Sequence, residues 1–106
     1  MKKGYALHPG VLQDLREIHA YIAQDSLDAA DQVFDDIMER IRALVPFPHQ
    51  GHKRPDLTAR PLRFLRVYDY LIAYAPEKKP MWVVAVLHSR RDPKLLAAIL
   101  RSREEG

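Results

Sequence analysis

The sequence contains no cysteine among its 106 residues. This absence excludes disulfides, iron–sulfur clusters and thiol catalysis, and it fits a reducing compartment. Long apolar stretches are also missing, because no run approaches the roughly 20 residues that a membrane-spanning helix requires. The basic start of the chain, from Met1 to Tyr5, is not followed by the apolar region of a signal peptide. We therefore expect a cytoplasmic protein that does not associate with membranes.

Several common catalytic patterns are absent as well. The chain has neither a glycine-rich phosphate loop nor a Gly-x-Ser-x-Gly nucleophile elbow. His49 and His52 are three positions apart in a proline-bracketed loop, but no third metal ligand is evident. Asp35 and Asp36 are neighbours on a predicted helix and point in different directions, so they make a poor acid/base pair. We expect no metal and no cofactor.

The residues that are present describe one folded domain, residues 1–106. Hydrophobic residues make up 47% of the chain and charged residues 29%, which is typical of a folded soluble protein. Charge is unevenly distributed: residues 1–48 hold five Lys and Arg against eight Asp and Glu, whereas residues 49–106 hold twelve against six. A basic second half indicates an anionic partner, either nucleic acid or an acidic protein.

Hydrophobic spacing predicts a helical hairpin in the first half. A short strand over residues 5–8 ends at Pro9 and Gly10, and apolar residues at helical spacing follow over residues 11–22. Ser26 is the predicted N-cap of a second helix, whose apolar stripe includes Phe34 and which ends at Pro46. The acidic side chains of the hairpin are expected on its solvated outer face: Asp14, Glu17, Asp31, Asp35 and Glu39.

The second half is predicted to form a sheet and a final helix. After a loop over residues 46–61, strands over 62–68, 70–75 and 81–88 make an antiparallel meander, and Pro93 begins a helix over 93–103. The element order is β-α-α-β-β-β-α, an α+β domain with the helical hairpin and the N-terminal strand packed on a small antiparallel sheet.

The strand over residues 81–88 is apolar on both faces, and the hairpin covers only one of them. Either the terminal helix or a partner chain must cover the other face. We expect another chain to dock there.

This same strand ends in a cationic cluster. His88 is its last residue, and Arg90 and Arg91 follow at once. We expect the start of the first meander strand and the end of the third to share one end of the sheet. Arginine suits phosphate or carboxylate groups because its guanidinium is planar and always charged. Alternatively, Arg90 and Arg91 form structural ion pairs with Asp69 or Asp92. The residues expected to converge are Lys53, Arg54, Arg63, His88, Arg90 and Arg91.

Taken together, these segments resemble the RelE/ParE toxin superfamily of bacterial type II toxin–antitoxin systems over nearly the whole chain. The resemblance rests on motifs in a fixed order, namely Leu12-x-x-Leu15-x-x-Ile18-x-x-Tyr21-Ile22-Ala23, Ala29-Ala30, Phe47-Pro48-x-x-Gly51, Arg63 with its strand, Tyr70 to Tyr74, and Val86 to Asp92. It implies a small toxin encoded beside an antitoxin, whose C-terminal segment wraps around the toxin and neutralises it.

Two actions are known in this superfamily. RelE-like members cleave messenger RNA on the ribosome with arginines, lysines and usually a C-terminal tyrosine, and ParE-like members poison DNA gyrase without nuclease activity. The terminal helix here has no tyrosine or histidine, which favours the ParE-like, non-enzymatic action with no catalytic residue assigned. The residues then expected to bind the target are Lys53, Arg54, Arg63, Arg90 and Arg91.

Two other interpretations stay open from the sequence. In a RelE-like endoribonuclease, Arg63, His88 and Arg90 would act at the phosphate of the ribosome-bound messenger RNA. A family member whose toxicity has decayed would serve as a binding partner or regulator together with its antitoxin.

Overall fold

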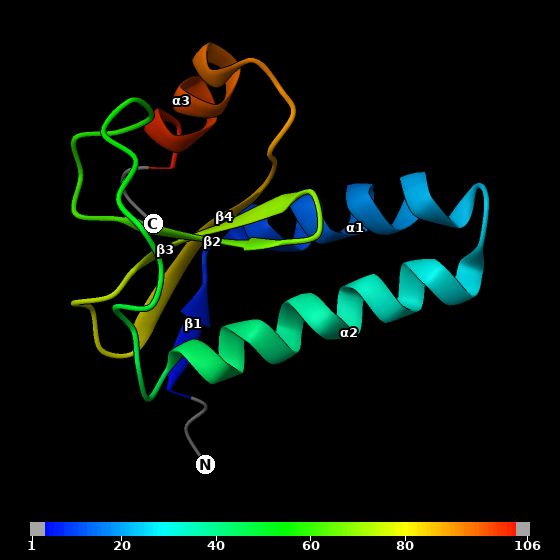
Figure 1. Ribbon diagram of the computed structural model, residues 1–106, viewed down its shortest axis with the longest axis horizontal. Coiled ribbons are helices and arrows are strands. Elements are labelled where there is room, and N and C mark those ends of the chain that lie inside the picture. The colour runs from blue at the N-terminus through cyan, green and yellow to red at the C-terminus, as the bar shows by residue number, and fades with distance from the viewer. Residues whose placement is uncertain (1–3, 104–106) are drawn as a thin grey trace.

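The computed structural model describes residues 4–103. It confirms the predicted α+β fold and the order of its elements (Figure 1). The elements are β1 (Tyr5–Leu7), α1 (Pro9–Ala23), α2 (Leu27–Leu44), β2 (Arg63–Val67), β3 (Tyr70–Ala75), β4 (Met81–His88) and α3 (Pro93–Arg101). None of the described helices is long and apolar enough to span a membrane.

Side-chain caps fix the starts of the helices. The Ala29 N–H donates to the Ser26 hydroxyl at 3.1 Å, which confirms Ser26 as the N-cap of α2. α1 is capped by His8, whose Nδ1 accepts a hydrogen bond from Gly10 N–H at 2.9 Å. Asp92 caps α3 in the same way. The break between α1 and α2 is therefore local, and the two helices fold back on each other as an antiparallel hairpin.

The sheet has the strand order β1-β4-β3-β2. β2, β3 and β4 form the predicted antiparallel meander, and β1 adds an edge strand that runs parallel to β4. The register between β3 and β4 shifts between Ala73 and Tyr74, which leaves Val84 as an extra residue in β4. This β-bulge places both Val84 and Ala85 in the core on one face of the sheet.

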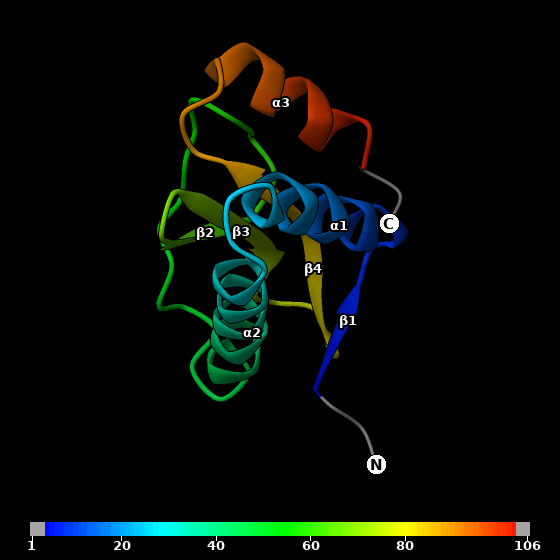
Figure 2. The ribbon, with the colours of Figure 1, turned by 90° about the vertical axis from the view of Figure 1, so that its right-hand side faces the viewer.

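The helical hairpin covers the other face, as Figure 2 shows. Leu15 of α1 and Ile37 of α2 are buried against Ile72 and other residues of the sheet. The buried stripe of the hairpin is narrower than predicted, because Leu12 and Phe34 remain exposed.

α3 covers the second face of β4. Leu96 and Leu100 are almost fully buried against Leu87 and its neighbours, and the loop before β2 adds Leu57 to the same cluster. Arg60 ties this loop to the end of α3 by donating to the Leu100 carbonyl at 3.0 Å. The terminal helix thus closes the face, and our expectation that another chain docks on it is wrong for the folded chain.

Candidate functional site

The predicted cationic residues do not converge, so this expectation is wrong. β2 and β4 both pair with β3 in antiparallel fashion and therefore run in the same direction. Arg63 at the start of β2 lies opposite Tyr74, which in turn lies opposite Val83. His88 is five residues further along β4, about 16 Å away along the strand.

The first cationic group lies at the start of β2 and is engaged in local structure. Arg63 donates to the Gly51 carbonyl at 2.8 Å, and Arg54 makes two hydrogen bonds to Asp56 at 2.9 and 2.8 Å. The Arg54 guanidinium lowers the pKa of Asp56 below its usual value. Lys53 is exposed beside them. At this end of the sheet Arg63 holds the loop that leads into β2.

The second cationic group consists of Arg66, Arg90 and Arg91. It lies at the end of β4, next to the two-residue turn that joins β2 and β3. Asp69 in this turn accepts from Arg66 Nη2 at 3.1 Å and forms an ion pair with Arg90 Nε at 3.6 Å. The Asp69 carbonyl also accepts the Ser89 N–H at 2.7 Å. Arg90 nevertheless stays 74% exposed. The alternative of an Arg90–Asp69 ion pair is therefore observed, but the pair is exposed and the Arg90 guanidinium remains accessible.

Arg66 was not among the residues expected at this site. It pairs with Leu71 near the end of β2, and its neighbour Val67 pairs with Tyr70, which lies opposite His88. The strand directions alone are enough to place Arg66 at this site, because β2 and β4 run in the same direction and terminate at the same end of the sheet. Arg66 thus takes the place that the sequence analysis gave to Arg63.

His88 is held in place by contacts with Tyr70 and Arg90. Its ring contacts Tyr70 edge-on, with 5.2 Å between centroids, and its Nδ1 accepts the Arg90 N–H at 3.2 Å. A neutral imidazole has a single acceptor nitrogen. In His88 this nitrogen is Nδ1, which is engaged by the Arg90 backbone. His88 therefore positions the Arg90 backbone, and its basic lone pair is occupied.

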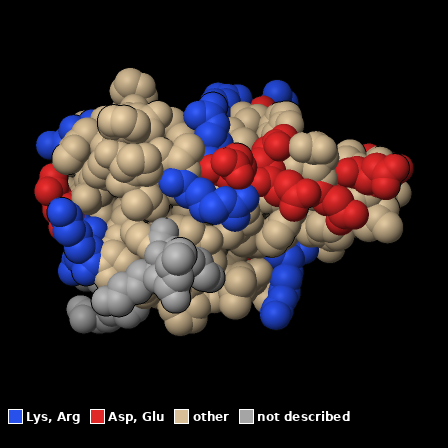
Figure 3. Space-filling model, turned by 90° about the horizontal axis from the view of Figure 1, so that it is seen from below, with Lys and Arg blue, Asp and Glu red and all other residues tan. Residues whose placement is uncertain are grey.

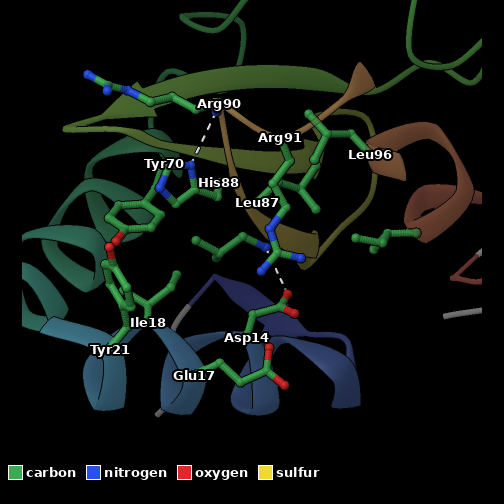
Figure 4. A pocket seen from close by; sticks show the side chains of 12 residues that line it. Asp14, Glu17, Ile18, Tyr21, Tyr70, Leu87, His88, Arg90, Arg91 and Leu96 are labelled. Carbon is green, nitrogen blue, oxygen red and sulfur yellow. Dashed lines mark hydrogen bonds between the residues drawn. The ribbon is translucent and has the colours of Figure 1, made fainter. Parts of the chain in front are cut away.

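A cavity of about 560 Å³ opens beside this cluster, between α1, the end of β4 and α3. Ile18 of α1 and Ile99 of α3 contribute apolar walls, and Arg90 and Arg91 lie at its rim. In Figure 4 the Arg91 side chain points into the cavity toward α1, whereas Arg90 points away from it. The two adjacent arginines thus serve different surfaces, one facing the cavity and the other facing the β2–β3 turn.

One residue that lines the cavity, Asp14 of α1, belongs to an ion pair that the sequence analysis missed. Asp14, expected on the solvated face of the hairpin, is only 13% exposed and pairs with Arg103, which is 14% exposed. This expectation is wrong because the residue faces β4, where it also accepts the Val86 N–H at 3.0 Å. Arg103 donates to Asp14 Oδ1 at 2.8 Å and to the Val84 carbonyl at 3.2 Å.

These two side chains replace a missing strand neighbour. β1 pairs with only three residues of β4, from Met81 to Val83. The backbone N–H and carbonyl groups of β4 beyond Val83 that face this side therefore have no strand beside them. A carboxylate then takes the Val86 N–H, and a guanidinium takes the carbonyl of Val84. The Asp14 carboxylate raises the pKa of Arg103 further, so the guanidinium stays charged.

The charges are unevenly distributed on the face that Figure 3 draws. Most acidic side chains on this face gather over the helical hairpin, and basic side chains lie next to them and at the opposite end of the molecule. Within residues 4–103, no three His, Cys, Asp or Glu side chains lie close enough together to hold a metal ion. What the second cationic group and the cavity offer chemically is the binding of an anionic group next to an apolar contact.

Comparison with known families gives one result. A family model described as the ParE toxin of the type II toxin–antitoxin system, parDE, matches residues 5–93. The match includes the hairpin, the whole sheet and the two arginines after β4. No curated protein matches the chain.

Proposed function

The chain belongs to the ParE toxin family of type II toxin–antitoxin systems, and from this premise we propose that it inhibits DNA gyrase by binding through Arg90 and Arg91. Membership in the family implies a cognate antitoxin as a partner. The proposed action is binding without catalysis. Because gyrase acts on DNA in the cytoplasm, we expect the toxin to act there as well.

One observation carries this proposal: the arginines at the end of β4 are exposed, and the histidine beside them has its lone pair occupied by the backbone. His88 Nδ1 accepts the Arg90 N–H, so the group nearest to the cluster is poorly placed to take a proton from a ribose hydroxyl. An exposed guanidinium binds carboxylates without any proton transfer. Binding to an acidic protein surface therefore fits the geometry better than cleavage of RNA.

The ribonuclease alternative needs Arg63, His88 and Arg90 at one phosphate. Arg63 lies at the other end of the sheet, with its guanidinium on backbone carbonyls. The geometry gives this alternative no specific support.

Purified toxin tests the proposal in a gyrase supercoiling assay. We expect Arg90→Ala/Arg91→Ala to raise the inhibitory concentration at least about tenfold, because a hydrogen bond to a charged group contributes about 1.5–3 kcal/mol. Lys78→Ala/Lys79→Ala is the matched control, since it removes the same charge from the exposed turn before β4. A folded double arginine variant that inhibits as well as the wild type would show that the target binds elsewhere.

The antitoxin is expected to compete with gyrase. We place its neutralising segment in the cavity between α1 and α3, because an apolar segment there would cover Arg91. Adding the antitoxin encoded beside this chain should restore supercoiling in the same assay. An antitoxin that binds the toxin tightly but leaves gyrase inhibited would contradict this placement.

A further inference from the structure

The turn between β2 and β3 has an unusual residue at its tip. Tyr68 has a φ of 56°, in the left-handed region, and it is the one described non-glycine residue with positive φ. Glycine, asparagine and aspartate are the residues that usually occupy such turn positions, because a bulky side chain is strained there. Tyr68 is nevertheless 55% exposed, so burial of its ring does not offset the strain.

The exposed ring is also fixed in one position. The Tyr68 hydroxyl donates a hydrogen bond to Asp36 in the middle of α2, and this bond raises the pKa of Tyr68. The Tyr68 carbonyl accepts from Arg66 Nε at 2.8 Å. Both ends of the residue are thus tied to other elements. A rigid exposed ring loses little conformational entropy when a partner binds it.

Two guanidinium groups meet at Asp69, the residue that follows Tyr68 in the turn. Asp69 holds Arg66 on one carboxylate oxygen and Arg90 on the other. Tyrosine and arginine are the residues that most often dominate protein–protein interfaces. Backbone strain at an exposed position is typical of functional sites, where another requirement outweighs stability.

From these observations we propose that Tyr68, with Arg66 and Arg90 paired on Asp69, forms a protein-binding surface for a carboxylate next to an apolar side chain on the toxin's target. This surface rests on the proposed function for its target and adds Tyr68 and Arg66 to the residues that bind it. Asp69 acts as a positioning residue, because it holds the two guanidinium groups side by side.

The charge of the surface selects a protein over nucleic acid. At the guanidinium pair, Arg66 and Arg90 with Asp69 leave a single net positive charge, which matches one carboxylate. The acidic α2 helix lies directly beside the ring through Asp36. A nucleic acid brings a row of phosphates, which requires a wide basic face and would be repelled by the helix.

Three variants test the proposal without relying on a loss of folding. Tyr68→Asn removes the ring and suits the left-handed backbone, so its melting temperature should equal or exceed that of the wild type. Tyr68→Phe keeps the ring but loses the bond to Asp36. Phe47→Asn is the matched control, because Phe47 is also exposed (69%) but follows the end of α2.

Growth arrest after induction is the first measurement, and gyrase inhibition and antitoxin affinity of the purified variants follow. We expect Tyr68→Asn to lose at least tenfold in gyrase inhibition and to stop arresting growth, Tyr68→Phe to lose less, and Phe47→Asn to match the wild type. Antitoxin affinity should stay within threefold of the wild type in all of them.

The other possible outcomes would overturn the surface or assign it to a different partner. A folded Tyr68→Asn chain that is as toxic as the wild type overturns the surface. Loss of antitoxin affinity with toxicity retained assigns the surface to the antitoxin instead. Salt-dependent binding of a DNA duplex that Tyr68→Asn abolishes assigns it to nucleic acid. If the wild type arrests growth without inhibiting gyrase, the proposed function fails, but loss of toxicity in Tyr68→Asn still supports the surface.

Discussion

The ion pair between Asp14 and Arg103 predicts a large and specific stability effect. Asp14 accepts hydrogen bonds from both Arg103 Nη atoms and from Val86 N–H, and both side chains of the pair are nearly buried. Removing one partner of a buried ion pair costs about 3–5 kcal/mol. Arg103 lies two residues beyond α3, so its freed side chain can turn toward water. We therefore expect Asp14→Ala to lower the free energy of unfolding by about 3 kcal/mol, the lower end of that range.

The reverse substitution should cost less. Arg103→Ala leaves Asp14 its hydrogen bond from Val86, and we expect a loss of about 2 kcal/mol. The double variant should lose about 3.5 kcal/mol, which corresponds to a coupling energy of about 1.5 kcal/mol.

Urea unfolding followed by circular dichroism measures all four chains, with the change read from the midpoint at constant slope. Glu17→Ala is the control, because Glu17 is an exposed acidic residue on the same helix; its effect should stay within about 0.5 kcal/mol. A coupling energy below about 0.5 kcal/mol, the usual limit of additivity, would refute the claim that these side chains act as a unit.

Three further substitutions follow from single contacts. A Cβ at Gly10 would lie 2.6 Å from the Arg103 guanidinium, so Gly10→Ala should destabilise the wild type. In the Arg103→Ala variant this clash is absent, and the same substitution should stabilise the chain through a gain in helix propensity of about 1 kcal/mol. Urea midpoints in the two backgrounds decide the sign of each effect. Ser89→Ala should leave the melting temperature unchanged or raise it, because the buried Ser89 hydroxyl has no hydrogen-bond partner among the described residues. Burial lowers the pKa of His8 below 6.5, with a smaller contribution from Arg103. The unfolded chain therefore binds more protons, and stability should fall as the pH drops below about 6.5; His8→Asn, which keeps a capping side chain, should flatten the dependence of the urea midpoint on pH.

The elements of this fold can be predicted from the sequence because their signals are local. Ser26 and Pro93 mark helix starts by their own chemistry, and both lie where the structure begins α2 and α3. The boundaries of β3 and β4 also match the predicted strands. Hydrophobic spacing and turn residues carry this information without reference to distant parts of the chain.

The candidate site depends on distant pairing, and there the sequence is less informative. Arg63 and Arg66 are three residues apart on one strand, and only the direction of β2 relative to β4 decides which of them reaches the end of β4. Asp14 looks like any surface acid on a helix until Arg103, 89 residues later, is placed beside it. The bulge at Val84 leaves no signal in a continuous apolar run, because it arises from the pairing of β4 with β3.

We propose that this toxin acts on DNA gyrase by binding. The most direct measurement is a DNA-damage reporter in bacteria, read together with growth after induction of the chain without its antitoxin. Growth arrest with a strong reporter signal, lost in the Arg90→Ala/Arg91→Ala variant, is the predicted result. Growth arrest with a silent reporter and rapidly cleaved transcripts would contradict the claim and would indicate action on the ribosome.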